Sequence, residues 1–218
     1  LMADLGYGSY LAQGGDWGSI ITTELGRIDA DHLLGIHITM PIVGPTQQAR
    51  DNPQPEDLLA FQKLEFRKTV DGGYAEIQGT MPQTIGYALD DSPAGLAAWI
   101  LEKFRTWSDC EGDLLRSYTW DQLLTNISIY WFTQTASSSA RIYYEMRQSQ
   151  INFDLVEIPV AIARFPGEIF LPPRAWCEQV YNIKRWTEFG HGGHFAAMEV
   201  PQLLVGDLRA WLTHLKDD

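Results

Sequence analysis

The apolar and polar positions near the start of the chain predict a strand, a sharp turn and a helix in direct succession. Residues 9–13 (SYLAQ) form a short apolar run with the length of a buried strand, and residues 19–27 continue with helical spacing. A second run, residues 33–40, is rich in β-branched residues and is closed by Pro41. Two strands that enclose one helix form a βαβ unit, which predicts a parallel sheet.

The pattern changes over residues 43–157, where helical spacing and loops replace the strand pattern. Pro and Ser or Thr at the first positions of helices, and Gly at their ends, indicate where these helices begin and stop. One helix is predicted to begin at Pro55 and to stop at Gly72-Gly73. A second begins at Ser92-Pro93, and a third begins at the capping box of Thr119 with Gln122.

Strand patterns return in the last part of the chain. Residues 158–163 and 184–189 read as strands, with a helix over about residues 174–181 between them and a final amphipathic helix from residue 195 to about 215. We therefore predict an α/β fold in three segments. Residues 1–42 and 158–218 form a mostly parallel core, and residues 43–157 form a helical cap inserted into it.

A glycine-flanked acidic residue lies between the first strand and its helix. Residues 14–18 (GGDWG) match the small-x-nucleophile-x-small elbow of α/β-hydrolases, with Asp16 at the nucleophile position. The alternative is an ordinary glycine-rich turn in which Asp16 caps the helix. A carboxylate is a nucleophile at neutral pH without a base, and it attacks saturated carbon to leave an ester that water must cleave. The motif therefore points to an epoxide or an alkyl halide as substrate.

An acid and a histidine follow this elbow in the order that α/β-hydrolases use. Glu168 lies in the loop after the strand at residues 158–163, and His194 lies in the loop before the final helix. Taken alone, Glu168 would be a solvated loop carboxylate and His194 a capping or core histidine. The three residues in this order predict a catalytic triad.

Four segments resemble the microsomal-type epoxide hydrolases, including their juvenile-hormone-hydrolysing relatives. They are residues 13–19 (QGGDWGS), 91–104 (DSPAGLAAWILEKF), 121–126 (DQLLTN) and 192–197 (GGHFAA). The resemblance covers essentially the whole chain. It implies an α/β-hydrolase core with a helical cap inserted between two core strands, which agrees with the pattern of strands and helices.

The resemblance also implies a role for each residue of the triad. Asp16 is the nucleophile, His194 the base that activates water, and Glu168 the acid that orients the imidazole. The backbone N–H of Trp17, directly after the nucleophile, is expected to be one oxyanion donor.

Two cap tyrosines complete the chemistry that the resemblance implies, because the oxygen of an opening epoxide needs an acid near it. The segment GGYAEIQ at residues 72–78 places the first at Tyr74. The segment RIYYE at residues 141–145 places the second at Tyr143, with Tyr144 as the fallback after a shift of one residue. These tyrosines favour an epoxide hydrolase over a haloalkane dehalogenase, which also uses an Asp elbow followed by Trp but holds a halide.

The sequence departs from this family in one respect. The family's second oxyanion donor comes from a His-Gly-type loop after an early strand, and this sequence contains neither that loop nor the early core strands. Residues 1–5 look like the end of a helix that stops at Gly6. We therefore expect an unpaired edge at the strand before the elbow, which invites aggregation or pairing with another chain. A third hypothesis is accordingly an incomplete relative without turnover.

The amino-acid composition limits the classes of molecule that the chain is expected to bind. The 218 residues are 45% hydrophobic and 12% aromatic, with a net charge of −12, which argues against a nucleic-acid surface and suits a small uncharged apolar substrate. The resemblance implies that the substrates are a small apolar epoxide and water. The sequence contains no run of 18 or more apolar residues, so no membrane contact is evident in this segment. The cellular location stays open. We expect no cofactor. Cys110 and Cys177 form no metal-type spacing and read as free thiols. We also expect no metal, because the pair His191 and His194 lacks a third strong ligand.

Overall fold

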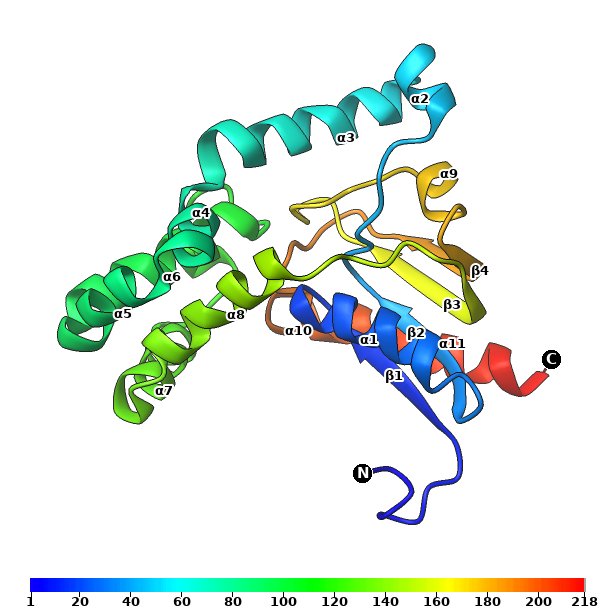
Figure 1. Ribbon diagram of the computed structural model, residues 1–218, viewed down its shortest axis with the longest axis horizontal. Coiled ribbons are helices and arrows are strands. Elements are labelled where there is room, and N and C mark those ends of the chain that lie inside the picture. The colour runs from blue at the N-terminus through cyan, green and yellow to red at the C-terminus, as the bar shows by residue number, and fades with distance from the viewer. Residues whose placement is uncertain (218) are drawn as a thin grey trace. The chain divides into compact units, whose positions relative to one another are not determined.

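The computed structural model describes residues 1–217 and divides into two compact units, Leu1–Leu64 with Phe153–Asp218, and Glu65–Asn152. The first unit is built on a four-stranded sheet in the order β1-β2-β3-β4, with every neighbouring pair parallel (Figure 1). This confirms the predicted parallel sheet. The strands are β1 (Tyr10–Gly14), β2 (Leu33–Ile38), β3 (Val156–Arg164) and β4 (Tyr181–Glu188).

The two faces of this sheet are covered by different helices. Helix α1 (Trp17–Ile28) packs so closely on one face that a Cβ at its Gly26 would lie 3.0 Å from Val156 and 3.5 Å from Ile36. Helix α11 (Pro201–Asp217) covers the other face, where His37 contacts Asp207. Successive residues of a strand point to opposite faces, so Ile36 faces α1 and His37 faces α11.

Two predicted helices of this unit have different bounds in the structure. The helix expected over residues 174–181 is only α9 (Arg174–Cys177), and Tyr181 already begins β4. The expected final helix is divided into α10 (Ala196–Glu199) and α11, because Pro201 has no N–H to continue the helical hydrogen bonds. Residues 2–6 form turns instead of a helix end, although Gly6 does take the left-handed φ of 86°.

The second unit consists of helices packed on one another. Its α-helices are α4 (Gly73–Thr80), α5 (Pro82–Asp91), α6 (Pro93–Trp107), α7 (Trp120–Thr133) and α8 (Ala136–Gln148), with a 3₁₀ turn η2 at Leu114–Arg116. The Ser92 hydroxyl accepts from Gly95 N at 3.0 Å, and Thr119 with Gln122 forms the predicted capping box. The run that begins at Pro55 ends before Gly72, as predicted, and α4 begins at Gly73. The run continues beyond α3 (Pro55–Phe66) as a π-helical turn, η1, at Arg67–Asp71.

The compact helical unit is shorter than the cap segment expected from the sequence. Helix α2 (Gln47–Asp51) and most of α3 are grouped with the sheet. Ala49 and Ala60 are buried in the same hydrophobic core as Trp176, whose indole N–H donates to Asp57 at 2.7 Å. These contacts attach the first part of the expected cap segment to the core.

Candidate active site

Asp16 occupies the turn between the end of β1 and the start of α1. Its backbone has φ 50° and ψ −126°, a conformation that residues with a Cβ seldom adopt and that is found at functional turns. It stands at the N-cap position of α1, yet its side chain makes no capping hydrogen bond. The carboxylate is 44% exposed, so it is accessible to a substrate.

The glycines around Asp16 are required by space. A Cβ at Gly14 would lie 2.0 Å from the carbonyl oxygen of Gly18, and a Cβ at Gly15 would lie 2.6 Å from the hydroxyl of Thr39. Without a side chain, Gly14 lets β1 approach α1 this closely, and Gly15 leaves room for Thr39 after β2. The elbow therefore presents Asp16 at the carboxyl end of the sheet.

The loops that follow β3 and β4 reach the same end of the sheet and are joined to each other. Gly167 N donates to Gly192 O at 3.0 Å, and Gly167 pairs with Gly193 as an isolated parallel bridge. Gly192 has φ 99°, and a Cβ there would lie 2.7 Å from Val200. This bridge holds the loop of Glu168 beside the loop of His194.

The three residues of the predicted triad meet in the structure. The Nδ1 atom of His194 lies 2.6 Å from Glu168 Oε1, and its Nε2 atom lies 3.6 Å from Asp16 Oδ2. A carboxylate can only accept, so Nδ1 donates to Glu168 and fixes the ring orientation. Glu168 and His194 are buried, whereas Asp16 faces outward. This is the arrangement of an exposed nucleophile, a base behind it and a buried orienting acid.

The two carboxylates strongly favour the protonated imidazole. Burial by itself lowers the pKa of His194, but the charges and hydrogen bonds of Glu168 and Asp16 outweigh burial and raise that pKa to about 10. In the free site, an imidazolium between the two carboxylates is therefore favoured over the neutral ring.

Lys63, on α3, also supports the acid loop. Its ammonium group donates to the carbonyl oxygen of Glu168 at 2.8 Å and to that of Pro166 at 3.3 Å. Burial lowers the pKa of Lys63, and the nearby Glu168 charge opposes that shift. Sequence reasoning missed this residue, because an isolated lysine about a hundred positions earlier carries no recognisable motif.

Trp17 is the first residue of α1 and directly follows Asp16. The N–H groups in the first turn of a helix have no acceptor further back in that helix and carry partial positive charge. This position suits the expected oxyanion donor.

The two predicted cap tyrosines lie together in the helical unit. The rings of Tyr74, on α4, and Tyr143, on α8, meet edge to face with centroids 5.6 Å apart, and both side chains are half-buried. Tyr144, the fallback residue, is 40% exposed. Residues that sequence reasoning did not identify contact Tyr74: Arg67 donates to its hydroxyl at 3.2 Å, and Lys103 lies over its ring.

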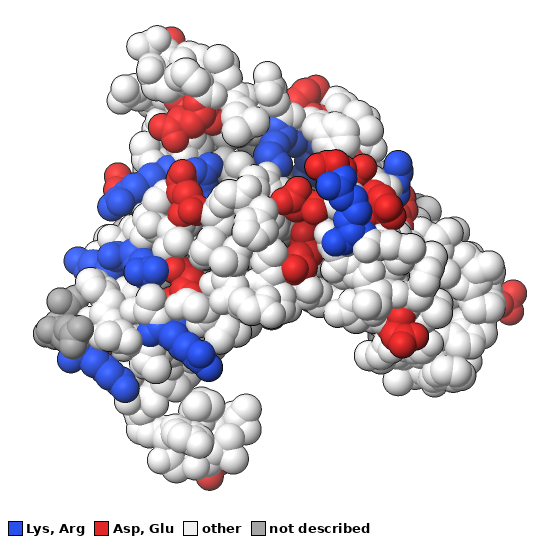
Figure 2. All heavy atoms as spheres, turned by 180° about the vertical axis from the view of Figure 1, so that it is seen from behind, with Lys and Arg blue, Asp and Glu red and all other residues white. Residues whose placement is uncertain are grey.

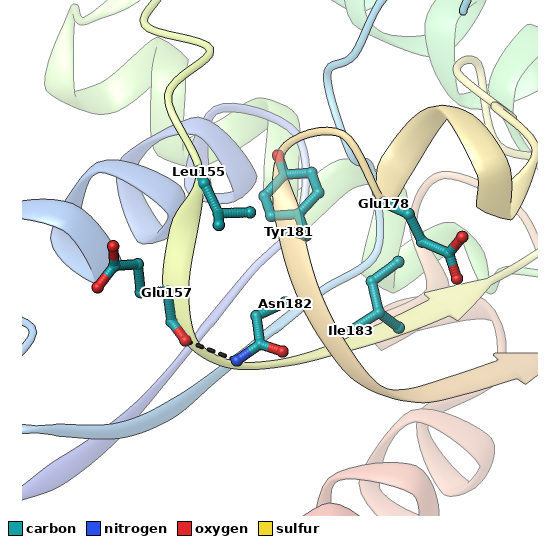
Figure 3. A pocket seen from close by; sticks show the side chains of 6 residues that line it. All are labelled: Leu155, Glu157, Glu178, Tyr181, Asn182 and Ile183. Carbon is teal, nitrogen blue, oxygen red and sulfur yellow. Dashed lines mark hydrogen bonds between the residues drawn. The ribbon is translucent and has the colours of Figure 1, made fainter.

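A surface pocket of about 420 Å³ lies elsewhere in the sheet unit. Figure 3 shows its lining, in which Asn182 donates to the carbonyl oxygen of Glu157. The pocket lies where β3 and β4 begin, whereas Glu168 and His194 follow the ends of these strands. The pocket and the triad therefore lie at opposite ends of these strands. Ligands of open α/β sheets bind at the carboxyl ends, which is the end that carries the triad.

Acidic and basic side chains are interspersed on the face of the molecule drawn in Figure 2. Within residues 1–217, no three His, Cys, Asp or Glu side chains gather as they would around a metal ion. Cys110 and Cys177 are free and buried. None of the helices in this range is both long and apolar enough to cross a membrane.

Known proteins similar to this chain include epoxide hydrolases. Epoxide hydrolase 1 of Sus scrofa is 35% identical over 243 residues, which cover 97% of this chain and 52% of the relative. A protein of Stigmatella aurantiaca with the provisional name of epoxide hydrolase is 44% identical over 99% of this chain and 49% of its own length. This chain is a homologue of the epoxide hydrolases.

Solved structures of these enzymes superpose on almost all of the chain. The juvenile hormone epoxide hydrolase of Bombyx mori matches with a TM-score of 0.87 and 28% identity, over 99% of this chain and 57% of that structure. The epoxide hydrolase of Aspergillus niger matches with a TM-score of 0.82 and 30% identity, over 98% and 55%. The α/β-hydrolase fold is thereby established, and the chain spans about half the length of these relatives. No family model matches the chain.

Proposed function

We propose that this chain carries the catalytic residues of an epoxide hydrolase that converts apolar epoxides to vicinal diols through an ester on Asp16. One observation carries the proposal: an accessible carboxylate at a strained elbow lies 3.6 Å from an imidazole that is itself held by a buried acid. In a serine hydrolase the elbow presents a hydroxyl to an acyl carbon. A carboxylate in its place attacks saturated carbon instead.

In the first half of the proposed reaction, an oxygen of Asp16 attacks an epoxide carbon. The C–O bond of the ring breaks, and its electron pair stays on the oxygen. Tyr74, with Tyr143 as second donor, supplies the proton that makes this oxygen a hydroxyl. The products of this half are a hydroxyalkyl ester and a tyrosinate.

In the second half, His194 in its neutral form removes a proton from water, and the hydroxide attacks the ester carbonyl of Asp16. The Trp17 N–H stabilises the oxyanion that forms, and Glu168 keeps the imidazole oriented. Collapse of the intermediate releases the diol and regenerates the Asp16 carboxylate. The proton that His194 loses when it becomes neutral returns to the tyrosinate through solvent, and the proton taken from water restores the imidazolium of the free site.

Isotope labelling tests the covalent route. In a single turnover in ¹⁸O-water with enzyme in excess, the label should enter the peptide that contains Asp16, because water attacks the ester carbonyl and an older Asp16 oxygen leaves with the diol. Label that appears directly in the first diol would refute Asp16 as nucleophile. Turnover of haloalkanes with none of epoxides would favour a dehalogenase instead.

We further propose that the chain pairs with another polypeptide strand along β1. In the described part of the chain, β2 is the only strand that pairs with β1. An edge of this kind offers unpaired backbone N–H and C=O groups to another strand.

A further inference from the structure

Tyr74 lies against two basic side chains of the helical unit. Arg67, in the π-helical turn η1, places Nη1 3.2 Å from the Tyr74 hydroxyl oxygen, and its guanidinium carbon lies 5.9 Å from the ring centroid. Lys103, on α6, places its ammonium 4.5 Å from the same centroid. Tyr74 also packs edge to face on Trp107, at 5.2 Å between centroids.

Lys103 has acidic partners as well as its contact with Tyr74. Lys103 lies 2.8 Å from Asp71 and 2.8 Å from Glu102, so two carboxylates offset its field at the tyrosine. Asp71 is buried, and its other oxygen accepts from the Trp107 indole at 2.8 Å. This network holds the Lys103 ammonium over the face of the Tyr74 ring. Arg67 is the cation that contacts the phenolic oxygen itself.

The direction of the Arg67 hydrogen bond has a chemical consequence. A guanidinium has donors and no acceptor, so Tyr74 accepts from Arg67 and must direct its own O–H away from it. The phenolic proton is thus directed to a group other than Arg67. When that proton leaves, the negative charge that forms on the oxygen is already hydrogen-bonded to a cation, and such charge-assisted bonds are about twice as strong as neutral ones.

We propose that Arg67 is a positioning residue for the reaction: it orients the Tyr74 hydroxyl and stabilises the tyrosinate that forms when Tyr74 gives its proton to the opening epoxide. This inference rests on the proposed function for the acid role of Tyr74. Nothing in the sequence motif around Tyr74 identifies Arg67. Arg67 lies in the π-helical turn η1, which directly precedes α4, the helix that carries Tyr74.

Titration of Tyr74 tests the proposal without any turnover. The ultraviolet absorbance of tyrosinate is followed against pH in the 218-residue chain and in Tyr74→Phe, and the difference gives the Tyr74 titration. The same difference is then measured in Arg67→Met and Arg67→Lys. We expect Arg67→Met to move the Tyr74 midpoint upward by about one pH unit or more, because a cation at this distance favours the anion, and Arg67→Lys to restore part of the shift.

Arg105→Met is the matched control, because Arg105 is on α6 but donates to the carbonyl oxygen of Gly112. It should leave the Tyr74 midpoint unchanged. An unchanged midpoint in a folded Arg67→Met would overturn the proposal, as would an equal shift in Arg105→Met.

Kinetics separate this inference from the proposed function. In single turnovers, Arg67→Met should slow formation of the Asp16 ester about tenfold or more and leave ester hydrolysis unchanged, with Arg67→Lys intermediate. If Tyr74→Phe forms the ester at the normal rate, Tyr74 is not the acid and both proposals fail for this residue. If Tyr74→Phe is slow but Arg67→Met is not, only the role of Arg67 is wrong.

Discussion

His194 and Glu168 form a buried pair: their side chains are 2% and 1% exposed, and His194 Nδ1 lies 2.6 Å from Glu168 Oε1. Water cannot easily compete for this bond, so the imidazole is held with Nε2 toward Asp16. The pair determines both the orientation and the proton affinity of the proposed base.

Loss of the base should separate the two halves of the reaction. In His194→Gln the Asp16 carboxylate remains, so an epoxide should still alkylate it, but hydrolysis of the ester should slow by roughly 10²–10⁴. Asp16→Ala should form no adduct. Intact-protein mass spectrometry after mixing with an epoxide measures both. His191→Gln is the matched control, because His191 is an exposed histidine three positions away. An adduct on Asp16→Ala would contradict the assigned roles.

Glu168→Gln should change the pH dependence of ester hydrolysis. The Glu168 charge raises the pKa of His194, so its removal should lower that pKa. A base acts in its neutral form, and the acid limb of the pH-rate profile should therefore move to lower pH, while the maximal rate falls because the ring loses its orienting acceptor. Single-turnover hydrolysis across the acidic and neutral range measures the limb. The exposed Glu178→Gln should match the parent, and a limb that stays in place would count against the coupling.

The tyrosines should matter for ring opening alone, because the oxygen they contact is already a hydroxyl during ester hydrolysis. Tyr74→Phe and Tyr143→Phe should each slow adduct formation by roughly 10²–10⁴ if their acid role is full. Tyr144→Phe is the neighbouring control. Stopped-flow measurement of the alkylation rate in the three variants shows which tyrosines act as acids. Damage from Tyr144→Phe with a silent Tyr143→Phe would mean that the assignment is wrong by one residue.

The elbow should tolerate a methyl group at one of its glycines and not at another. A Cβ at Gly14 would lie 2.0 Å from a backbone oxygen, whereas a Cβ at Gly18 meets nothing within 4 Å. Gly14→Ala should therefore lower the free energy of unfolding by about 1–3 kcal/mol or more, and Gly18→Ala should change it little. Thermal denaturation of the two variants measures the difference. Equal melting temperatures would show that the elbow can rearrange.

The edge of β1 should make the isolated 218-residue chain associate. Unpaired strand edges pair with other strands, and apolar residues near this end of the chain, Leu5 and Tyr7 among them, are exposed. We expect concentration-dependent oligomers or aggregates in size-exclusion chromatography with light scattering. A longer polypeptide that adds a strand beside β1 should be more soluble and more active. A monomeric chain with a cooperative thermal transition and turnover like that of a full-length relative would contradict this.

Local sequence signals predicted the parts of the fold that local chemistry determines. The apolar runs predicted four strands, and the caps at Ser92 and Thr119 predicted the starts of α6 and α7. The order of Asp16, Glu168 and His194 predicted residues that the structure brings within hydrogen-bonding or ion-pair distance. The strand and cap predictions succeeded because each depends on a few neighbouring residues.

Features that depend on distant contacts were not predictable in this way. The lysine of α3 that supports the acid loop contacts a carbonyl oxygen about a hundred positions later in the chain. The π-helical turn that carries Arg67 was also not predicted. Pro201 is a local signal for the break between α10 and α11, but the amphipathic pattern continues across it and predicted one helix. The attachment of α2 to the sheet depends on the burial of Ala49, which periodicity alone does not reveal.

The place of His194 between two carboxylates gives the proposed reaction an order of events. While Asp16 is free, its charge helps to keep His194 protonated, and a protonated ring cannot activate water. Formation of the ester removes that charge, so the proton affinity of the ring falls at the moment when a base is needed. The nucleophile thus restrains the base until the nucleophile itself has been consumed.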